Sequence, residues 1–441
     1  MEVIKRDGTT EPFDTRKVYN AIEKAMIATK GENVDSGFIE NITQDVAVKL
    51  NKTKGDIHVE DIQDIVEEKL MASRYKDVAR NFINYRQLHK LARDNYAELM
   101  QAIEEKLSAQ NVMNQNANVD EKSFGGRVGE ASDLVMKKYA LDFLVSPMSK
   151  ANHENNEIYI HDLNSYAVGS HNCLSIPFDD LLANGFNTRQ TDIRPAQSVS
   201  TAFQLVAVIF QLQSLQQFGG VSATHLDWTM VPYVRKSFYK HLMDGYKYIE
   251  HIENPKGIYM QETSDDFWTQ YTDIEDKDLL ATHPDAYEYA MDMTTKEVYQ
   301  AVEGMYHNLN TLQSRSGNQL PFTSINYGTC TLPEGRLVTK ALLDVSIKGI
   351  GKLHKTSIFP CGIFQCMKGI NRAPDDPNYD LFQLALKSTS LRLYPNYANV
   401  DWSGNEGYDR NNPKTYFSTM GKRKLSPCKT FMNLFCLKGV T

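Results

Sequence analysis

The chain has 441 residues, of which 41% are hydrophobic and 23% charged, with a formal net charge of −7. This length suits two or three domains, and the acidic balance argues against a general nucleic-acid-binding protein. No apolar run reaches membrane-spanning length, and the first residues contain no hydrophobic signal core. We therefore expect a cytoplasmic protein that contacts neither nucleic acid nor a membrane.

The first 95 residues are predicted to form a small helical domain that begins with a β-hairpin. Asp7-Gly8 is a hairpin-turn signal, because glycine accepts a positive φ. Apolar residues at helical spacing predict helices over four ranges: 16–29, 36–50, about 59–70 and 76–93. Lys5 and Arg6 in the hairpin and Lys17 near the first helix start could form a phosphate site. A solvated basic turn explains the same spacing equally well.

Residues 96–130 are predicted to be a linker, because a helical pattern to about residue 107 is followed by an amide-rich run.

The strongest candidate for a catalytic residue lies further along the chain. An extended run is predicted over 158–160, and His171, Asn172 and Cys173 then stand together before an apolar segment. A thiol among hydrogen-bonding groups suits redox or radical chemistry. A buried cysteine acting as a small hydrophobe is the structural alternative.

The rest of the chain alternates helical and strand-like patterns, which predicts an α/β barrel or sheet. Helices are expected over 198–218, 227–244, 292–315, 337–354 and 380–391. A strand over 322–327 carries Thr323 and Ser324, whose hydroxyl groups suit a polyhydroxylated or phosphorylated ligand.

The six cysteines lack the spacing of a disulfide framework or a tetrahedral zinc site, so the sequence alone predicts no metal site.

The N-terminal motifs resemble those of an ATP-cone, the nucleotide-sensing regulatory domain of ribonucleotide reductases. The matching motifs are Val3-Ile-Lys-Arg-Asp-Gly8, Phe13-Asp-x-x-Lys-Val18, Ala21-Ile-x-Lys-Ala25, Val59-x-x-Ile-Gln-Asp-x-Val-Glu67 and Tyr85-Arg86. The resemblance implies that Lys5, Arg6, Glu11 and Lys17 contact ATP or dATP, which would act as an allosteric effector. The spacing of these residues does not itself identify adenine.

Motifs across residues 1–421 resemble the anaerobic (class III) ribonucleoside-triphosphate reductase. They are Tyr159-Ile-His-Asp-Leu163, Gly169-x-His-Asn-Cys173, Gln319-x-Pro-Phe-Thr-Ser324, Ile358-Phe-Pro360 and Tyr416-Phe-Ser-Thr-Met-Gly421. The resemblance implies an α/β fold, the ten-stranded barrel of glycyl radical enzymes with helices outside. Residues 131–421 would supply an incomplete barrel.

The same resemblance implies a mechanism and a set of partners. A radical S-adenosylmethionine activase makes a glycyl radical, which oxidises a barrel cysteine to a thiyl. The thiyl abstracts the ribose 3′ hydrogen of a ribonucleoside triphosphate, and Cys173 corresponds to a second cysteine that assists loss of the 2′-hydroxyl. His171, Asn172, Thr323 and Ser324 are the candidates for substrate binding. The family forms homodimers.

The residues from position 420 onward determine which activity we expect of the chain. Met420 holds the place of a methionine that marks the subgroup using formate as reductant. The family pattern has the thiyl cysteine at position 422, but this chain has Lys422, whose strong N–H bond cannot replace S–H in reversible hydrogen-atom transfer. Residues 422–441 do not resemble the family, so the zinc site and radical glycine that the family implies are not expected here.

We therefore expect an enzyme of this family that is inactive alone, through a frameshift or an interrupted gene. The alternative is a nucleotide-binding regulatory or defective fragment that pairs with intact subunits. A pyruvate formate-lyase-like enzyme is a third reading, but it requires adjacent cysteines, which the sequence lacks.

Overall fold

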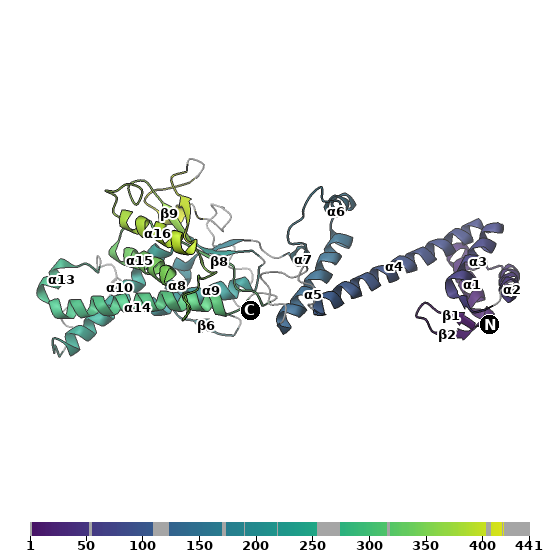
Figure 1. The fold of residues 1–441 in the computed structure, drawn as a ribbon, viewed down its shortest axis with the longest axis horizontal. Coiled ribbons are helices and arrows are strands. Elements are labelled where there is room, and N and C mark those ends of the chain that lie inside the picture. Colours follow the sequence, from purple (N-terminus) through teal and green to yellow (C-terminus); the bar gives the residue numbers. More distant parts are fainter. Residues whose placement is uncertain are drawn as a thin grey trace. The chain divides into compact units, whose positions relative to one another are not determined.

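The structure is a computed structural model that divides into two compact units, Met1–Glu104 and Glu105–Thr441 (Figure 1). Each unit is described by itself. The described residues are 2–52, 55–108, 123–169, 173–188, 190–217, 219–253, 274–314, 318–402, 407–416 and 418.

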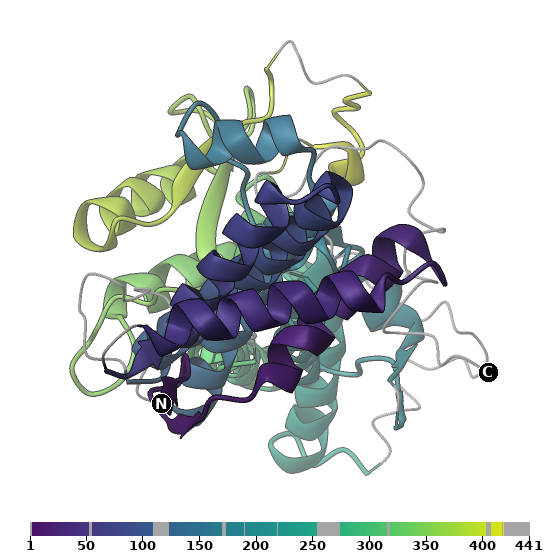
Figure 2. The same ribbon diagram turned by 90° about the vertical axis from the view of Figure 1, so that its right-hand side faces the viewer.

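The first unit combines a three-stranded sheet with four helices (Figures 1 and 2). Strand β1 (Glu2–Ile4) pairs antiparallel with β2 (Thr10–Pro12) and parallel with β3 (Ile57–His58). The helices are α1 (Thr15–Lys30), α2 (Ser36–Asn51), α3 (Val59–Ala72) and α4 (Lys76–Ser108). The carboxylates of Asp14 and Asp35 cap α1 and α2 by accepting backbone N–H groups. The predicted hairpin and four helices are confirmed.

Helix α4 runs without a break through residue 95, where the sequence pattern predicts the end of the first domain and the start of a linker. No proline or glycine interrupts residues 76–108, so nothing local stops the helix. The first compact unit ends at Glu104 rather than at residue 95, and residues 96–108 are helical. Of the predicted linker, residues 109–122 lie outside the described residues.

The second unit contains a parallel sheet with the strand order β10-β9-β8-β7-β4. Its strands are β4 (Leu174–Ile176), β7 (Val221–Ala223), β8 (Thr323–Tyr327), β9 (Cys361–Cys366) and β10 (Asn396–Asn399). A separate antiparallel pair is made by β5 (Phe186–Asn187) and β6 (Asp192–Ile193). The α/β class is confirmed, while closure into a ten-stranded barrel stays a prediction, because the described strands form an open sheet.

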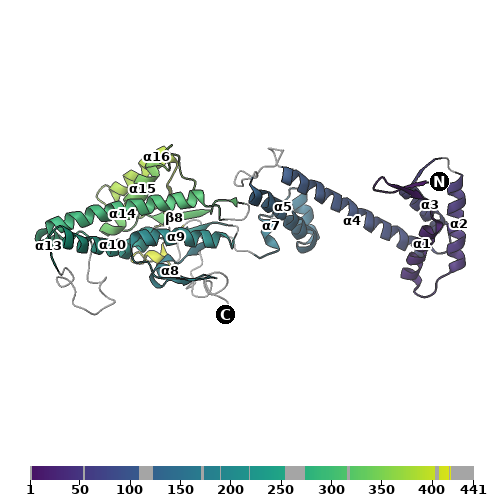
Figure 3. The same ribbon diagram turned by 90° about the horizontal axis from the view of Figure 1, so that it is seen from below.

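The α-helices of this unit that follow β4 contribute residues to one apolar core, whereas those before β4 do not. In chain order the described helical elements are α5 (Phe124–Tyr139), the π-helical turn Ala140–Leu144, α6 (Pro147–Glu154), α7 (Leu163–Tyr166), α8 (Phe178–Asn184), α9 (Val199–Ser214), α10 (Leu226–Tyr248), α13 (Lys277–Thr282), α14 (Pro284–Thr311), α15 (Pro333–Lys348), α16 (Tyr379–Arg392) and the 3₁₀ turn Pro413–Thr415. Helices α10 and α14 run side by side (Figures 1 and 3), and with α9 and α15 they bury the apolar face of the sheet.

The extended run expected over residues 158–160 joins no sheet, so that prediction is wrong. The Ile158 N–H donates to the carbonyl of Asn152, and the Ile160 N–H donates to Nδ1 of His153. Acceptors at the end of α6 therefore bind the two N–H groups, which in a β-strand would bond to a neighbouring strand. The strand of this region is β4, which begins directly after Cys173.

Two helical glycines of the second unit should respond in opposite directions to the same substitution. A Cβ added to Gly335 in α15 would lie 2.2 Å from Sγ of the buried Cys330, whereas one added to Gly304 in α14 meets nothing within 4 Å. We expect Gly335→Ala to lower the free energy of unfolding by about 1–3 kcal/mol through overpacking. Gly304→Ala should raise it by about 0.5–1 kcal/mol. Urea denaturation measures both, and equal shifts would contradict the contact at Cys330.

Candidate functional site

Of the four residues predicted to contact a nucleotide, Lys5, Glu11 and Lys17 lie together, whereas Arg6 bonds α3. Oε2 of Glu11 lies 2.8 Å from Nζ of Lys5, and its Oε1 lies 2.6 Å from Nζ of Lys17. The β1–β2 pairing places Lys5 near Glu11, and the first turn of α1 supplies Lys17. Arg6 faces α3, where its Nε donates to Oε1 of Glu60 at 2.5 Å and its Nη2 donates to Oε1 of Gln63 at 3.1 Å.

These charges are paired with one another but remain accessible. Hydrogen bonds from Lys17 and then Lys5 lower the pKa of Glu11, and the hydrogen bond with Glu11 raises the pKa of Lys5. Ion pairs exposed to solvent contribute little to folding. The lysines can therefore exchange a carboxylate partner for the phosphates of a ligand at small cost in stability.

Cys173 lies at the amino end of the parallel sheet, directly before β4. Its Sγ accepts the N–H of Gly220 at 3.3 Å, and the N–H of Leu174 donates to the Gly220 carbonyl at 3.0 Å. The thiol is half-buried. His171 and Asn172 lie outside the described residues, as do Met420 and Lys422.

Thr323 and Ser324 are neighbours in β8, so their side chains point to opposite faces of the sheet. Thr323 shares its face with Ile325 and Tyr327, which belong to the apolar core under the helices. Ser324 points to the other face. A ligand on one face of the sheet therefore contacts only one of the two predicted hydroxyl groups.

The register of the sheet aligns Ser324 with three further polar side chains, one on each of β4, β7 and β9. They are Ser175, Ser222 and Cys361. The Ser324 hydroxyl is fully buried and has no hydrogen-bond partner among the described residues. The sequence shows which side chains of one strand share a face. It does not show that these four polar residues are aligned, because their alignment depends on pairing between strands far apart in the chain.

Cys361 brings a second thiol to the row. It is half-buried and lies 3.6 Å from the hydroxyl of Tyr394. Burial raises the pKa of Cys361, although the contact with Tyr394 opposes this shift. The thiol form is therefore favoured at neutral pH, and its S–H donates to the Tyr394 hydroxyl.

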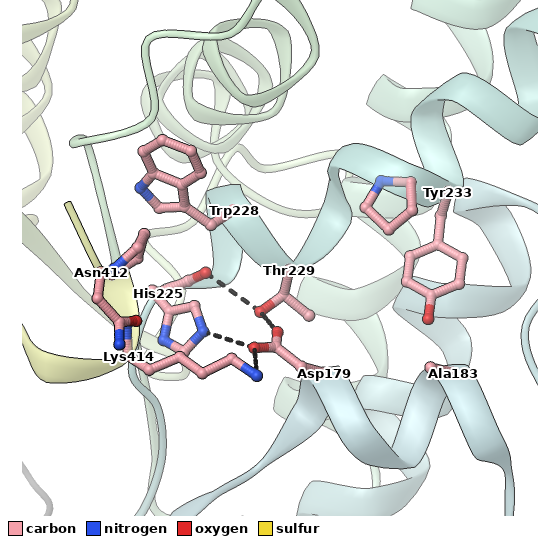
Figure 4. A pocket seen from close by; sticks show the side chains of 10 residues that line it. Asp179, Ala183, His225, Trp228, Thr229, Tyr233, Asn412 and Lys414 are labelled. Carbon is pink, nitrogen blue, oxygen red and sulfur yellow. Dashed lines mark hydrogen bonds and ion pairs between the residues drawn. The ribbon is translucent and has the colours of Figure 1, made fainter. Parts of the chain in front are cut away.

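The carboxyl end of the sheet contains a pocket of about 270 Å³ that the sequence patterns did not predict (Figure 4). Asp179 follows β4 and His225 follows β7, whereas Cys173 precedes β4, so the pocket and the thiol lie at opposite ends of the strands. Trp228 and Tyr233 of α10 supply apolar walls.

The Asp179 carboxylate organises the polar part of this pocket. Nε2 of His225 lies 2.9 Å from Oδ2, the Thr229 hydroxyl donates to Oδ1 at 2.6 Å, and Nζ of Lys414 lies 3.3 Å from Oδ2 (Figure 4). Burial alone raises the pKa of Asp179, but His225, Thr229 and Lys414 outweigh it and hold this pKa well below its usual range. The carboxylate thus ties the chain around Lys414 to α8 and α10.

Two negative findings concern only part of the chain. In the described ranges, no three His, Cys, Asp or Glu side chains are grouped so that they could hold a metal ion. The described helices include none with the length and apolar character needed to cross a bilayer.

Comparisons with known proteins identify both units. The family model of the ATP cone domain matches residues 1–91, nearly all of the first unit. The family model of the anaerobic ribonucleoside-triphosphate reductase matches residues 115–433, and so extends 12 residues beyond Gly421, where the resemblance was expected to end. The chain belongs to the anaerobic ribonucleoside-triphosphate reductase family, an enzyme family.

Individual relatives agree with this assignment. The anaerobic ribonucleoside-triphosphate reductase of Haemophilus influenzae is 34% identical over 404 residues, which cover 90% of this chain and 52% of the relative. That of Salmonella typhimurium is 31% identical over 402 residues, covering 90% and 51%. The chain thus spans about half the length of these curated relatives. A crystal structure of the Thermotoga maritima anaerobic ribonucleotide reductase in complex with dATP and CTP aligns with a TM-score of 0.45 and 13% identity, over 73% of this chain and 50% of that one.

Proposed function

We propose that the first unit binds ATP or dATP as an allosteric effector. The observation that carries this proposal is the convergence of Lys5 and Lys17 on Glu11 at the hairpin of an ATP cone domain, with Arg6 next to Lys5 in the chain. Cations of this kind suit charge-assisted hydrogen bonds to phosphate. Their present partners, Glu11 and Glu60, are partly exposed and can be displaced.

We propose that the second unit forms part of a site that reduces ribonucleoside triphosphates to deoxyribonucleoside triphosphates. Cys173 is the thiol that assists departure of the ribose 2′-hydroxyl, which leaves as water after gaining a proton. Ser324, on the polar face of the sheet, is the better placed of the two β8 hydroxyl groups to bond the substrate. The family's glycyl radical supplies the one-electron oxidation of this chemistry.

We also propose that the chain does not complete this reaction alone, because Lys422 stands where the family pattern has its thiyl cysteine. Formate as reductant, for which Met420 is the marker, belongs to the same proposal, as do a radical S-adenosylmethionine activase and a homodimer. Anaerobic incubation with activase, formate and labelled CTP is the test. Formation of dCTP would contradict the proposed inactivity.

Nucleotide binding is tested on the same 441-residue chain by isothermal titration with ATP and with dATP. Saturable binding is expected. Because a ligand that binds only the folded state stabilises it, ATP at 100 times its Kd should add about 2.7 kcal/mol to the stability of the first unit. Inorganic triphosphate serves as the control for charge alone. Absence of saturable binding by both nucleotides would contradict the proposed function of this unit.

A further inference from the structure

A single carboxylate joins the hairpin of the first unit to its last helix. Glu60, near the start of α3, accepts a hydrogen bond on Oε1 from Nε of Arg6 at 2.5 Å. Its Oε2 accepts hydrogen bonds from Arg86 of α4, at 2.6 Å from Nη2 and 3.2 Å from Nε. Glu60 therefore lies between a residue proposed to bind nucleotide and a residue of the helix that continues beyond this unit.

Arg86 is held almost entirely by the acidic face of α3. Its Nη1 donates to Oδ1 of Asp64 at 2.5 Å and to Oε1 of Glu67 at 2.9 Å. Residues 60, 64 and 67 lie on one face of α3 because of their helical spacing. Burial opposes the charge of Arg86, whose side chain is 17% exposed, but its carboxylate partners outweigh burial and raise its pKa. Three carboxylates thus face Arg86, and one of them, Glu60, also bonds Arg6.

Glu60 and a bound nucleotide compete for hydrogen bonds from the Arg6 guanidinium. A triphosphate carries more charge than one carboxylate and offers more acceptor oxygens, so it attracts the Arg6 guanidinium away from α3. Loss of Arg6 leaves the acidic face of α3 with one cation fewer. Among the described residues, Glu60 is then shared only by two arginines of α4, namely Arg86, which donates hydrogen bonds to it, and Arg93, whose Nη2 lies 4.0 Å from its Oε1. Hydrogen bonding of Arg86 to Glu60 therefore strengthens.

We propose that Arg6, Glu60 and Arg86 form a relay that transmits occupancy of the hairpin by a nucleoside triphosphate to α4. This inference rests on the proposed nucleotide binding of the same site. In the empty state the Arg6–Glu60 pair is closed and opposes binding. In the occupied state Arg6 bonds phosphate, and Glu60 is left to Arg86. Because such coupling is reciprocal, changes at Arg86, which the nucleotide does not touch, alter nucleotide affinity.

The test is a double-mutant cycle on the full chain, with ATP as the probe in isothermal titration. Glu60→Gln should bind ATP about 3- to 5-fold more tightly, the range for losing a partly exposed ion pair. Arg86→Gln should bind it several-fold more weakly, because Glu60 then keeps only Arg93, at 4.0 Å, beside Arg6. In the Glu60→Gln background, Arg86→Gln should have no further effect. Glu68→Gln is the matched control, since Glu68 is on α3 but pairs with Lys49.

A second measurement separates a relay from a local change of charge. Amide hydrogen exchange across residues 83–90 of α4 should change on addition of ATP to the wild-type chain and should not change in Glu60→Gln. Additive effects in the cycle, or equal exchange responses in both chains, overturn the relay while leaving nucleotide binding intact. If the wild-type chain binds no ATP, the proposed function and the relay both fail.

Discussion

Replacing Asp227 by asparagine is expected to lower the free energy of unfolding of the second unit by about 3 kcal/mol, because a buried acceptor with several donors is lost. Asp227 is fully buried at the start of α10. Its Oδ2 accepts the backbone N–H groups of Gly328 at 2.8 Å and Cys330 at 2.9 Å, and its Oδ1 accepts the N–H of Trp228 at 3.0 Å. These bonds hold the loop after β8 against α10.

Asparagine matches aspartate in shape but not in hydrogen bonding. Both carboxylate oxygens of Asp227 face N–H donors, so either orientation of an amide group turns its own N–H₂ toward a donor. Burial raises the pKa of Asp227, and the hydrogen bonds from Cys330, Gly328 and Trp228 counteract that rise. Burying the Asp227 carboxylate therefore costs folding free energy, but losing its hydrogen bonds would cost more.

Urea denaturation at neutral pH measures the effect, and Asp375→Asn is the control because Asp375 is exposed in the same unit. The control should stay within about 0.5 kcal/mol of the wild type. If Asp227→Asn also stayed within that range, the carboxylate would not be the group that holds the loop.

The hairpin and the helix starts of the first unit were predictable from sequence to within a few residues because their signals are local, whereas the end of its last helix was not. The Asp7-Gly8 turn fixes the hairpin, and Asp14 and Asp35 mark the starts of α1 and α2. The contacts of Glu11 with Lys5 and Lys17 span only six residues in each direction. The bond from Arg6 to Glu60 spans 54 residues and had no sequence signal, because it depends on the parallel pairing of β1 with β3.

The second unit was predictable in class but not in register. Alternating helices and strands predicted an α/β barrel or sheet, yet nothing in the sequence aligned Ser324 with Ser222 and Cys361. The short run at 158–160 looked extended because its residues favour strands, but it found no neighbouring strand. The Asp179 pocket draws on residues as distant as Lys414, so only the folded chain brings it together.

Replacing Lys17 by glutamine is expected to weaken ATP binding by about 10-fold or more, since a hydrogen bond to a charged group contributes about 1.5–3 kcal/mol. Lys17 stands in the first turn of α1, and Glu11 now holds its Nζ at 2.6 Å. Phosphate at this position would gain the lysine charge together with the favourable dipole of the helix start. Glutamine keeps much of the length of the side chain but removes the charge.

Lys49→Gln is the matched control for this change, because it alters net charge equally while Lys49 pairs with Glu68. Isothermal titration should give the control a Kd close to that of the wild type. The difference between Lys17→Gln and wild type should shrink as salt rises, since ions screen the interaction of an exposed cation with phosphate. Equal Kd values for the two variants would show that net charge, rather than the position of Lys17 beside the hairpin, governs binding. A 10-fold difference would assign Lys17 to the nucleotide site.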